Sequence, residues 1–132
     1  MAQLRHIAIT SPDPHATATF YESAFGMKRV WSREIGVMLT DGVVSLAVLS
    51  FPTDEMAGDE RGKDFHGLHH IGFVVDDLDA YAEQVKTHGG RYHMSLPSAE
   101  PSDTEHKYLD PDGVVVDIVN EHYAVNSWGA KP

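Results

Sequence analysis

Two histidines occupy matching positions in two similar short stretches of the chain, LRHIAI and LHHIGF. His6 lies in the first stretch and His70 in the second, 64 positions later. A neutral imidazole is the commonest metal ligand in proteins and the usual acid or base near neutral pH. The repetition therefore has three explanations: chance, an old duplication, or two ligands directed at one point.

Composition limits the chemistry and the partners of this chain. It has 132 residues, nine histidines and no cysteine, and 20 acidic against 10 basic residues give a formal charge of −10. Without cysteine there is no disulfide, thiolate metal site or cysteine nucleophile. The negative charge repels nucleic acid and anionic membranes. We therefore expect a small-molecule partner, with no nucleic acid and no membrane.

Length and the N-terminal residues bound the size and location of the protein. A chain of this length makes one compact domain, or two half-size units that share one core. No run approaches the roughly 18–20 apolar residues of a membrane span. The start, MAQLRHIAIT, lacks the basic and apolar regions of a signal peptide. Together with the missing cysteines, this predicts a cytoplasmic protein.

The first half of the chain has the order strand, helix, three strands. Residues 4–10 form a short β-compatible run, and Ser11-Pro12-Asp13-Pro14 then ends the strand and offers a helix start. The large apolar residues of 15–25 recur at helical spacing, and Gly26 stands where a C-cap glycine belongs. Three further strands are expected at 28–33, 36–40 and 43–51.

The same order begins again after a polar stretch, residues 52–65, which predicts an exposed linker. A strand is expected at 68–75, a helix between Asp76-Asp77 and Gly89-Gly90, and strands at 91–96, 106–109 and 114–120. The turn sequence Asp-Gly-Val-Val also recurs, at 41–44 and 112–115, with an offset of 71. Because this offset exceeds 64, a modest insertion is expected around 97–103.

The chain is therefore a tandem repeat of about 60 residues. One module spans 1–51, the linker 52–65, the second module 66–125 and a tail 126–132. One such unit alone buries too little surface to be stable. The two units must pack together into one structural domain, within one chain or between two chains. The tail, which contains Trp128, is expected to be disordered or to dock on a partner subunit.

Several short motifs keep this order along nearly the whole chain, from Leu4 to Glu121. They are His6, Phe20-Tyr21 and Phe25-Gly26 in the first half, and Leu68-His69-His70-Ile71, Asp77-Leu78 and Asp110-Pro111-Asp112-Gly113 in the second. In this combination they resemble the vicinal oxygen chelate superfamily, which includes glyoxalase I, bleomycin-resistance proteins, extradiol ring-cleaving dioxygenases and methylmalonyl-CoA epimerase. The resemblance implies an α+β fold, in which two tandem βαβββ modules form a cupped half-barrel sheet with flanking helices.

The resemblance also implies a metal site in the cup. Members of the superfamily hold one divalent metal there, with an early histidine and a late carboxylate or glutamine from each module. On this chain the resemblance places ligands at His6, His70 and Asp117, where the family usually has glutamate. Glu121 is the alternative carboxylate, because it shares the strand face of Asp117. The late position of the first module falls on Leu46, so the fourth ligand is missing.

Two histidines and one carboxylate with open positions form the ligand set of non-haem Fe(II) oxygenases. The resemblance then favours an extradiol-type dioxygenase, whose substrate chelates the metal through its oxygens. His106 is the candidate acid or base, and Tyr108 on the same face is the candidate hydrogen-bond donor to the substrate. His69 is a weaker candidate, because strand alternation points it away from the face of His70.

Two other functions fit the same resemblance. A glyoxalase-like lyase or an epimerase would use Zn, Ni, Mn or Co, with its fourth ligand from a partner chain. A metal-free drug-binding protein of the bleomycin-resistance type predicts that His6, His70 and Asp117 do not converge. Its acidic groove for basic ligands is compatible with the charge of −10 and with Trp31. All three functions favour a homodimer, and for the divalent metal we expect Fe(II), with Mn, Zn or Ni as alternatives.

Overall fold

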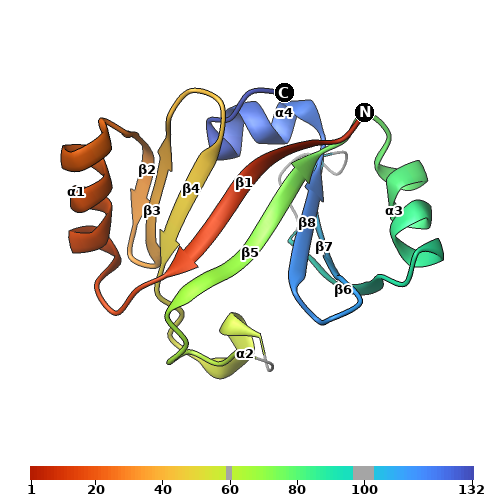
Figure 1. Ribbon diagram of the computed structural model, residues 1–132, viewed down its shortest axis with the longest axis horizontal. Helices are drawn as coiled ribbons and strands as arrows, with labels where there is room; N and C mark the ends of the chain where they lie inside the picture. Colours follow the sequence, from red (N-terminus) through yellow and green to blue (C-terminus); the bar gives the residue numbers. More distant parts are fainter. Residues whose placement is uncertain (59–60, 97–102) are drawn as a thin grey trace.

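The computed structural model describes residues 1–58, 61–96 and 103–132, which form one curved sheet of eight strands with helices against it (Figure 1). The strand order is β2-β3-β4-β1-β5-β8-β7-β6. The predicted α+β fold, with strand, helix and three strands in each half, is confirmed. The strands are β1 (Gln3–Thr10), β2 (Lys28–Arg33), β3 (Gly36–Thr40), β4 (Ser45–Leu49), β5 (Gly67–Val74), β6 (Arg91–Leu96), β7 (Glu105–Leu109) and β8 (Val115–Val119), and the helices are α1 (Pro14–Phe25), α2 (Asp54–Ala57), α3 (Leu78–Thr87), α4 (Glu121–Tyr123) and a π-helical turn (Ala124–Trp128).

The two modules join edge to edge within one chain. β1 pairs antiparallel with β5, so the first strands of both modules lie at the centre of the sheet. Each of them pairs in parallel with the last strand of its own module, β1 with β4 and β5 with β8. The sequence left open whether the modules pair within a chain or between chains. Here the pairing is within the chain, and it places His6 and His70 on adjacent strands.

The two longer helices begin and end where the sequence predicts. Asp13 caps α1 by accepting a hydrogen bond from the Ala16 amide, and Asp77 caps α3 through the Ala80 amide. Gly26 closes α1 with a φ of 71°, a left-handed conformation that glycine adopts without steric cost. The predicted linker is not entirely a loop, because Thr53 caps the short helix α2. The insertion expected around 97–103 lies, apart from Asp103, outside the described residues.

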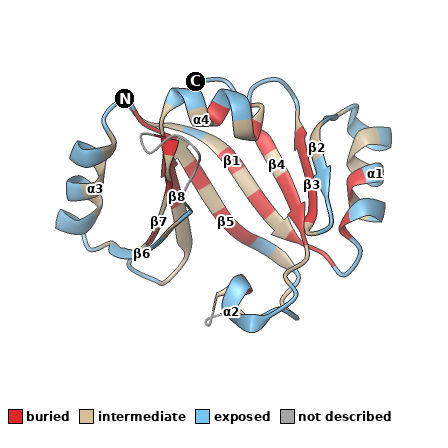
Figure 2. Cartoon of the chain, turned by 180° about the vertical axis from the view of Figure 1, so that it is seen from behind, coloured by how far each residue is buried: buried red, intermediate tan, exposed pale blue. Residues whose placement is uncertain are grey.

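We call the face of the sheet that α1 and α3 cover the outer face. Figure 1 places α1 beside β2, β3 and β4, and α3 beside β6, β7 and β8. Under α1, Ala18 packs against Val37 and Val48. Under α3, the core contains Tyr108 and Ile118. Most of the surface of both helices is exposed, whereas buried residues follow β1, β3, β4 and β5 (Figure 2).

The C-terminal segment, residues 121–130, packs on the opposite, inner face. Its Trp128 is 2% exposed and belongs to a cluster that includes Ala8, Met38 and Ala47 of the first module. The Thr40 hydroxyl donates to the carbonyl of Gly129 and fixes the end of the segment. The C-terminal segment therefore packs on its own chain, where it covers apolar residues of the first module. Among the described residues, no helix has the length and apolar character that a bilayer crossing requires.

Candidate metal centre

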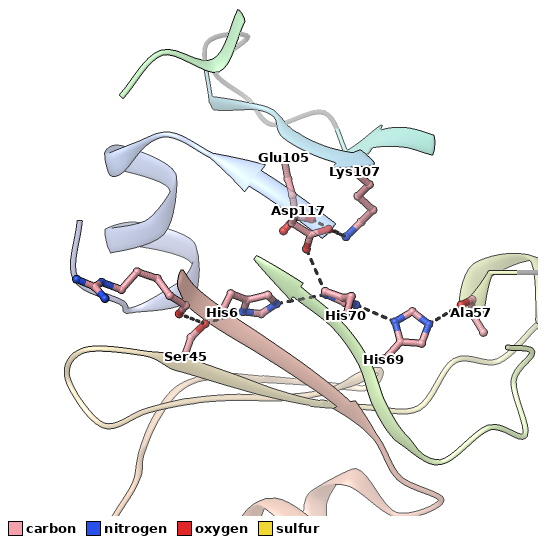
Figure 3. A network of polar contacts seen from close by, with 9 residues as sticks. His6, Ser45, Ala57, His69, His70, Glu105, Lys107 and Asp117 are labelled. Carbon is pink, nitrogen blue, oxygen red and sulfur yellow. Dashed lines mark hydrogen bonds and ion pairs between the residues drawn. The ribbon is translucent and has the colours of Figure 1, made fainter. Parts of the chain in front are cut away.

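Three buried side chains from three neighbouring strands converge at the middle of the inner face (Figure 3). They are His6 on β1, His70 on β5 and Asp117 on β8, which are 2%, 5% and 0% exposed. Nε2 of His70 lies 3.3 Å from Nε2 of His6 and 3.2 Å from Oδ2 of Asp117. One ligand atom from each residue lies within 4.8 Å of the others. The structure thus brings together the three ligands that the resemblance implied.

Strand register explains this convergence. Gly72 of β5 faces His6 on one side and Asp117 on the other. His70 is two residues before Gly72 and so shares its face. A Cβ atom on Gly72 would lie 2.7 Å from the Trp128 ring and 3.0 Å from Cβ of His6. Glycine at this position therefore leaves the space that the His6 and Trp128 side chains fill.

A short chain of hydrogen bonds fixes the proton of His70. His69 donates from Nε2 to the carbonyl of Ala57, so its Nδ1 is the acceptor for the Nδ1 proton of His70, 2.7 Å away. Nε2 of His70 then carries a lone pair toward the other two ligands. His69 was expected on the opposite face, and that prediction is wrong. A β-bulge between the pairs Ala8/His70 and Ile9/Leu68 breaks the alternation at His69.

His6 is held by a hydroxyl and by an aromatic ring. Its Nδ1 lies 2.6 Å from Oγ of Ser45, a residue directly opposite it on β4. Trp128 stacks on the imidazole with ring centroids 4.4 Å apart and an interplanar angle of 10°. When the Ser45 hydroxyl donates to the carbonyl of Arg5, it accepts the Nδ1 proton of His6 and leaves Nε2 free as a ligand.

Asp117 has one paired and one unpaired oxygen. Oδ1 accepts from Nζ of Lys107 at 2.8 Å, and Lys107 also lies 3.3 Å from the Glu105 carboxylate. Oδ2 is buried without a hydrogen-bond donor among the described residues. His70 is close to it but, with its proton on Nδ1, has none to offer. An unpaired carboxylate oxygen in a buried site is costly unless a cation is bound there.

Burial keeps both histidines in the form that binds metals. Desolvation by burial holds the pKa of His6 and of His70 well below the usual value. Nearby groups lower it further: His70 lowers the pKa of His6, and Lys107 lowers the pKa of His70. Burial opposes the charge of Lys107, but Asp117 and Glu105 outweigh it and raise the pKa of this ammonium. Desolvation, together with Asp117, raises the pKa of Glu105. At neutral pH both imidazoles are therefore neutral, and each has a lone pair available to a metal.

The donor set fits a divalent ion. Two ligand atoms held about 2.1 Å from one ion at tetrahedral or octahedral angles are about 3.0–3.4 Å apart. Two of the three separations, 3.3 Å and 3.2 Å, fall in this range, and all three ligand atoms lie within 4.8 Å of one another. Nε2 of His6, Nε2 of His70 and Oδ2 of Asp117 would hold the ion. Each of these side chains would be oriented by a hydrogen bond at its other polar atom: His6 by Ser45, His70 by His69 and Asp117 by Lys107.

The corresponding fourth position is Ala47, not Leu46. Ala47 pairs with Ala8, as Asp117 pairs with Gly72. Leu46 packs on the outer face under α1. The count of four residues from the turn glycine was one residue short, because two residues separate Gly42 from the start of β4 at Ser45, whereas only Val114 separates Gly113 from the start of β8 at Val115. The two turns also differ in their hydrogen bonds: Asp41 accepts from the amides of Val43 and Val44, and Asp110 accepts from those of Asp112 and Val114. The first module thus contributes only His6 to the site, and positions remain for substrate or water.

Three further predicted site residues lie elsewhere. Tyr108 packs under α3, and His106 shares its face and bonds to Ser95, so neither reaches the three ligands. The neighbouring Lys107 and Glu105 occupy the inner face instead, and the sequence analysis missed both. Alternation on β7 separates these two pairs, but only the pairing with β8 decides which pair faces inward. Glu121 begins α4 as an exposed residue, beyond the end of β8.

A cavity of about 180 Å³ adjoins the site on the inner face. Its lining includes His69, which bonds to His70, and Val115, the residue opposite His70 on β8. Ala57 and Arg61 of the linker and the exposed His93 of β6 also line it. A second, open cavity shares Arg61 and Gly113 with the first, and we call the two together the groove.

The buried histidines predict acid sensitivity of the metal-free protein. Because the folded pKa of His6 and His70 is lowered, the unfolded chain binds more protons below the ordinary pKa of about 6.5, and stability is lost as pH falls through that value. The slope should approach about 1.4 kcal/mol per pH unit for each histidine that stays neutral in the folded protein. Urea unfolding with a chelator, at pH values from 7.5 to 5, measures it.

A matched control separates this effect from general acid denaturation. His66 is exposed, so His66→Gln should keep the pH dependence of the wild type, whereas His70→Asn should flatten it. Equal slopes for His70→Asn and the wild type would contradict the assignment.

Comparisons with known proteins agree with the fold and the position of the site. Residues 3–118 match the sequence model of the Glyoxalase/Bleomycin resistance protein/Dioxygenase superfamily. Glyoxalase I of Saccharomyces cerevisiae is 24% identical over 165 aligned positions, which cover 97% of this chain and 49% of that protein. The chain thus spans about half the length of this relative.

Two solved structures are similar over nearly their whole length. A methylmalonyl-CoA epimerase variant of Streptomyces coelicolor, in complex with 2-nitronate-propionyl-CoA, superposes with a TM-score of 0.69 and 26% identity, over 89% of this chain and 96% of the other. A methylmalonyl-CoA epimerase in complex with methylmalonyl-CoA and NH4+ superposes with a TM-score of 0.69 and 24% identity, over 100% and 99%. At 24% identity, the second likeness concerns the fold alone.

Proposed function

Because the chain belongs to the Glyoxalase/Bleomycin resistance protein/Dioxygenase superfamily, we propose that it is a metal-dependent enzyme that moves a proton on a small carbonyl substrate. The reaction would be that of an epimerase or of a glyoxalase-like lyase. The observation that carries this proposal is the buried set of two imidazole nitrogens and one unpaired carboxylate oxygen around one point. The epimerase of 26% identity supports the choice of reaction.

A divalent ion in this site would act as a Lewis acid on a substrate carbonyl and so acidify the neighbouring C–H bond. The protein would bind the substrate in the groove and exclude water from the part of the groove beside His69. A cavity of about 180 Å³ is small for a whole cofactor-linked substrate. We therefore expect only the carbonyl end to enter it, with the remainder along the second cavity near Arg61.

We propose His93 as the residue that accepts the substrate proton. It lines the same cavity as His69, the residue that bonds to His70, and imidazole is the usual acid or base near neutral pH. Lys107 is a poorer candidate, because its pKa is raised and its ammonium group is bound to Asp117. The homodimer expected from the superfamily stays a prediction, which light scattering can test.

The Fe(II) dioxygenase predicted from the sequence is the second candidate. Two histidines and one carboxylate, with alanine at the fourth position, are the ligand set of such oxygenases. The relatives compared above, a glyoxalase and epimerases, give this reaction no specific support. The metal-free drug-binding alternative is disfavoured, because it required that His6, His70 and Asp117 not converge.

Metal analysis and deuterium exchange test the proposal together. The protein is purified without oxygen and its metal content measured, and then methylmalonyl-CoA in D2O is followed by proton NMR. We expect about one metal per chain and exchange of the substrate C–H, lost with a chelator and in His93→Gln. Iron with oxygen uptake on a catechol would instead favour the dioxygenase. No bound metal, even after divalent ions are supplied, would overturn both enzyme functions.

A further inference from the structure

We propose that His69 is a positioning residue that keeps the metal site free of a proton and links it to the wall of the substrate groove. The proposal rests on the metal site described under the proposed function. His69 touches no candidate ligand atom that faces the ion. It acts through His70 on one side and through the linker helix α2 on the other (Figure 3).

The first part of the argument concerns the proton of His70. A neutral imidazole has one N–H and one lone pair. Without a partner at Nδ1, His70 would place its proton on Nε2. Oδ2 of Asp117, an unpaired acceptor 3.2 Å away, would then accept a hydrogen bond from it. That hydrogen bond would fill the position of the metal. The Nδ1 atom of His69, at 2.7 Å, offers the competing acceptor and keeps the proton on the far side of the ring.

The second part concerns how His69 itself is fixed. Its Nε2 proton is donated to the carbonyl of Ala57, the last residue of α2, so its Nδ1 can only accept. The ring is 5% exposed and packs against Phe51 with centroids 4.9 Å apart. These contacts leave His69 one orientation and one tautomer. The backbone of the linker therefore determines which nitrogen of His70 is available to a metal.

The link works in both directions. Ala57, Gly58 and Arg61 form a wall of the cavity beside the site. A metal on Nε2 of His70 makes its Nδ1–H a stronger donor to His69, which in turn strengthens the bond from His69 to Ala57. Metal binding should therefore stabilise this wall, and disorder of the wall should weaken metal binding, as reciprocal coupling requires.

Two substitutions separate the two contacts of His69. In His69→Asn the side-chain oxygen takes the place of Nδ1, so the acceptor for His70 is kept and the bond to Ala57 is lost. In His69→Gln the amide nitrogen takes the place of Nε2, so the bond to Ala57 is kept and the acceptor is lost. His69→Phe removes both contacts, and His66→Gln, which changes an exposed histidine three residues away, is the control.

The measurements are Co(II) affinity by calorimetry and the trypsin cleavage rate after Arg61 and Lys63, with and without Co(II). In the wild type and in His66→Gln, Co(II) should slow cleavage. His69→Phe and His69→Gln should weaken Co(II) binding about 10- to 100-fold. His69→Asn should bind Co(II) within about threefold of the wild type, yet lose the protection of the linker.

The outcomes separate this proposal from the proposed function. If the wild type binds no Co(II), both are overturned. If it binds Co(II) and His69→Phe binds it equally well, the metal site stands and the positioning by His69 is wrong. Long-range 1H–15N spectra of the metal-free wild type need no variant to fold. They should show the His70 proton on Nδ1, and a proton on Nε2 would overturn the proposal.

Discussion

Replacement of His70 by alanine should raise the dissociation constant for a divalent cation by at least about 100-fold, since loss of an outer-shell partner alone costs 10- to 100-fold. His70 is the central residue of the candidate set, with its Nε2 3.3 Å from Nε2 of His6 and 3.2 Å from Oδ2 of Asp117. Its removal leaves two ligand atoms and a gap between them. Calorimetric titration with Co(II) or Zn(II), next to the metal content of the purified variant, measures the effect.

His106→Ala is the matched control, because this histidine was also a candidate from the sequence but lies on the other face of β7. We expect its metal affinity to stay within about twofold of the wild type, as for a residue outside the ligand shell. Asp117→Ala is a poorer test, because it leaves Lys107 buried with Glu105 as its one remaining carboxylate and so adds a folding defect. Equal losses in His70→Ala and His106→Ala would contradict the assigned ligand set.

Trp128→Ala should lower the free energy of unfolding by about 3–5 kcal/mol, the usual cost of removing a large buried aromatic side chain. Trp128 is the largest of the fully buried side chains and joins the C-terminal segment to Ala8, Met38 and Ala47. Its loss also removes the ring that stacks on His6. A lower urea midpoint at unchanged slope would measure the effect.

Trp128→Phe keeps an aromatic ring against His6 and should lose less than half as much stability. Trp31→Phe, in the same cluster but only partly buried, is a second control and should cost about 1 kcal/mol. A urea midpoint for Trp128→Ala equal to that of the wild type would show that the C-terminal segment is not packed on the sheet.

Part of the candidate site could be predicted because strands and turns repeat. His6 and His70 are each the fourth residue of corresponding strands, and two-residue alternation then directs both to the same side of a shared sheet. The resemblance to the superfamily then placed the third candidate ligand at Asp117, four residues after the glycine of the last turn. The helix ends at Asp13, Gly26 and Asp77 were also readable, because capping depends on residues within one turn of the helix.

The rest of the site required long-range information. His69 faces the site through a β-bulge, and a bulge arises from how two strands pair. The extra residue between Gly42 and β4 moves the fourth position from Leu46 to Ala47. Lys107 was overlooked because every residue of β7 except Tyr108 and Leu109 is polar, so its sequence does not reveal which face is buried.

By itself the sequence determined the duplicated α+β fold and the pair of strand histidines, because hydrophobic periodicity and helix capping are local properties of the chain. The tertiary structure alone decided that the modules pair within one chain, that the C-terminal segment covers the first module, and that Lys107 and His69 stand behind the ligands. These features depend on register and packing between residues far apart in the sequence, where a shift of one residue exchanges the two faces of a strand.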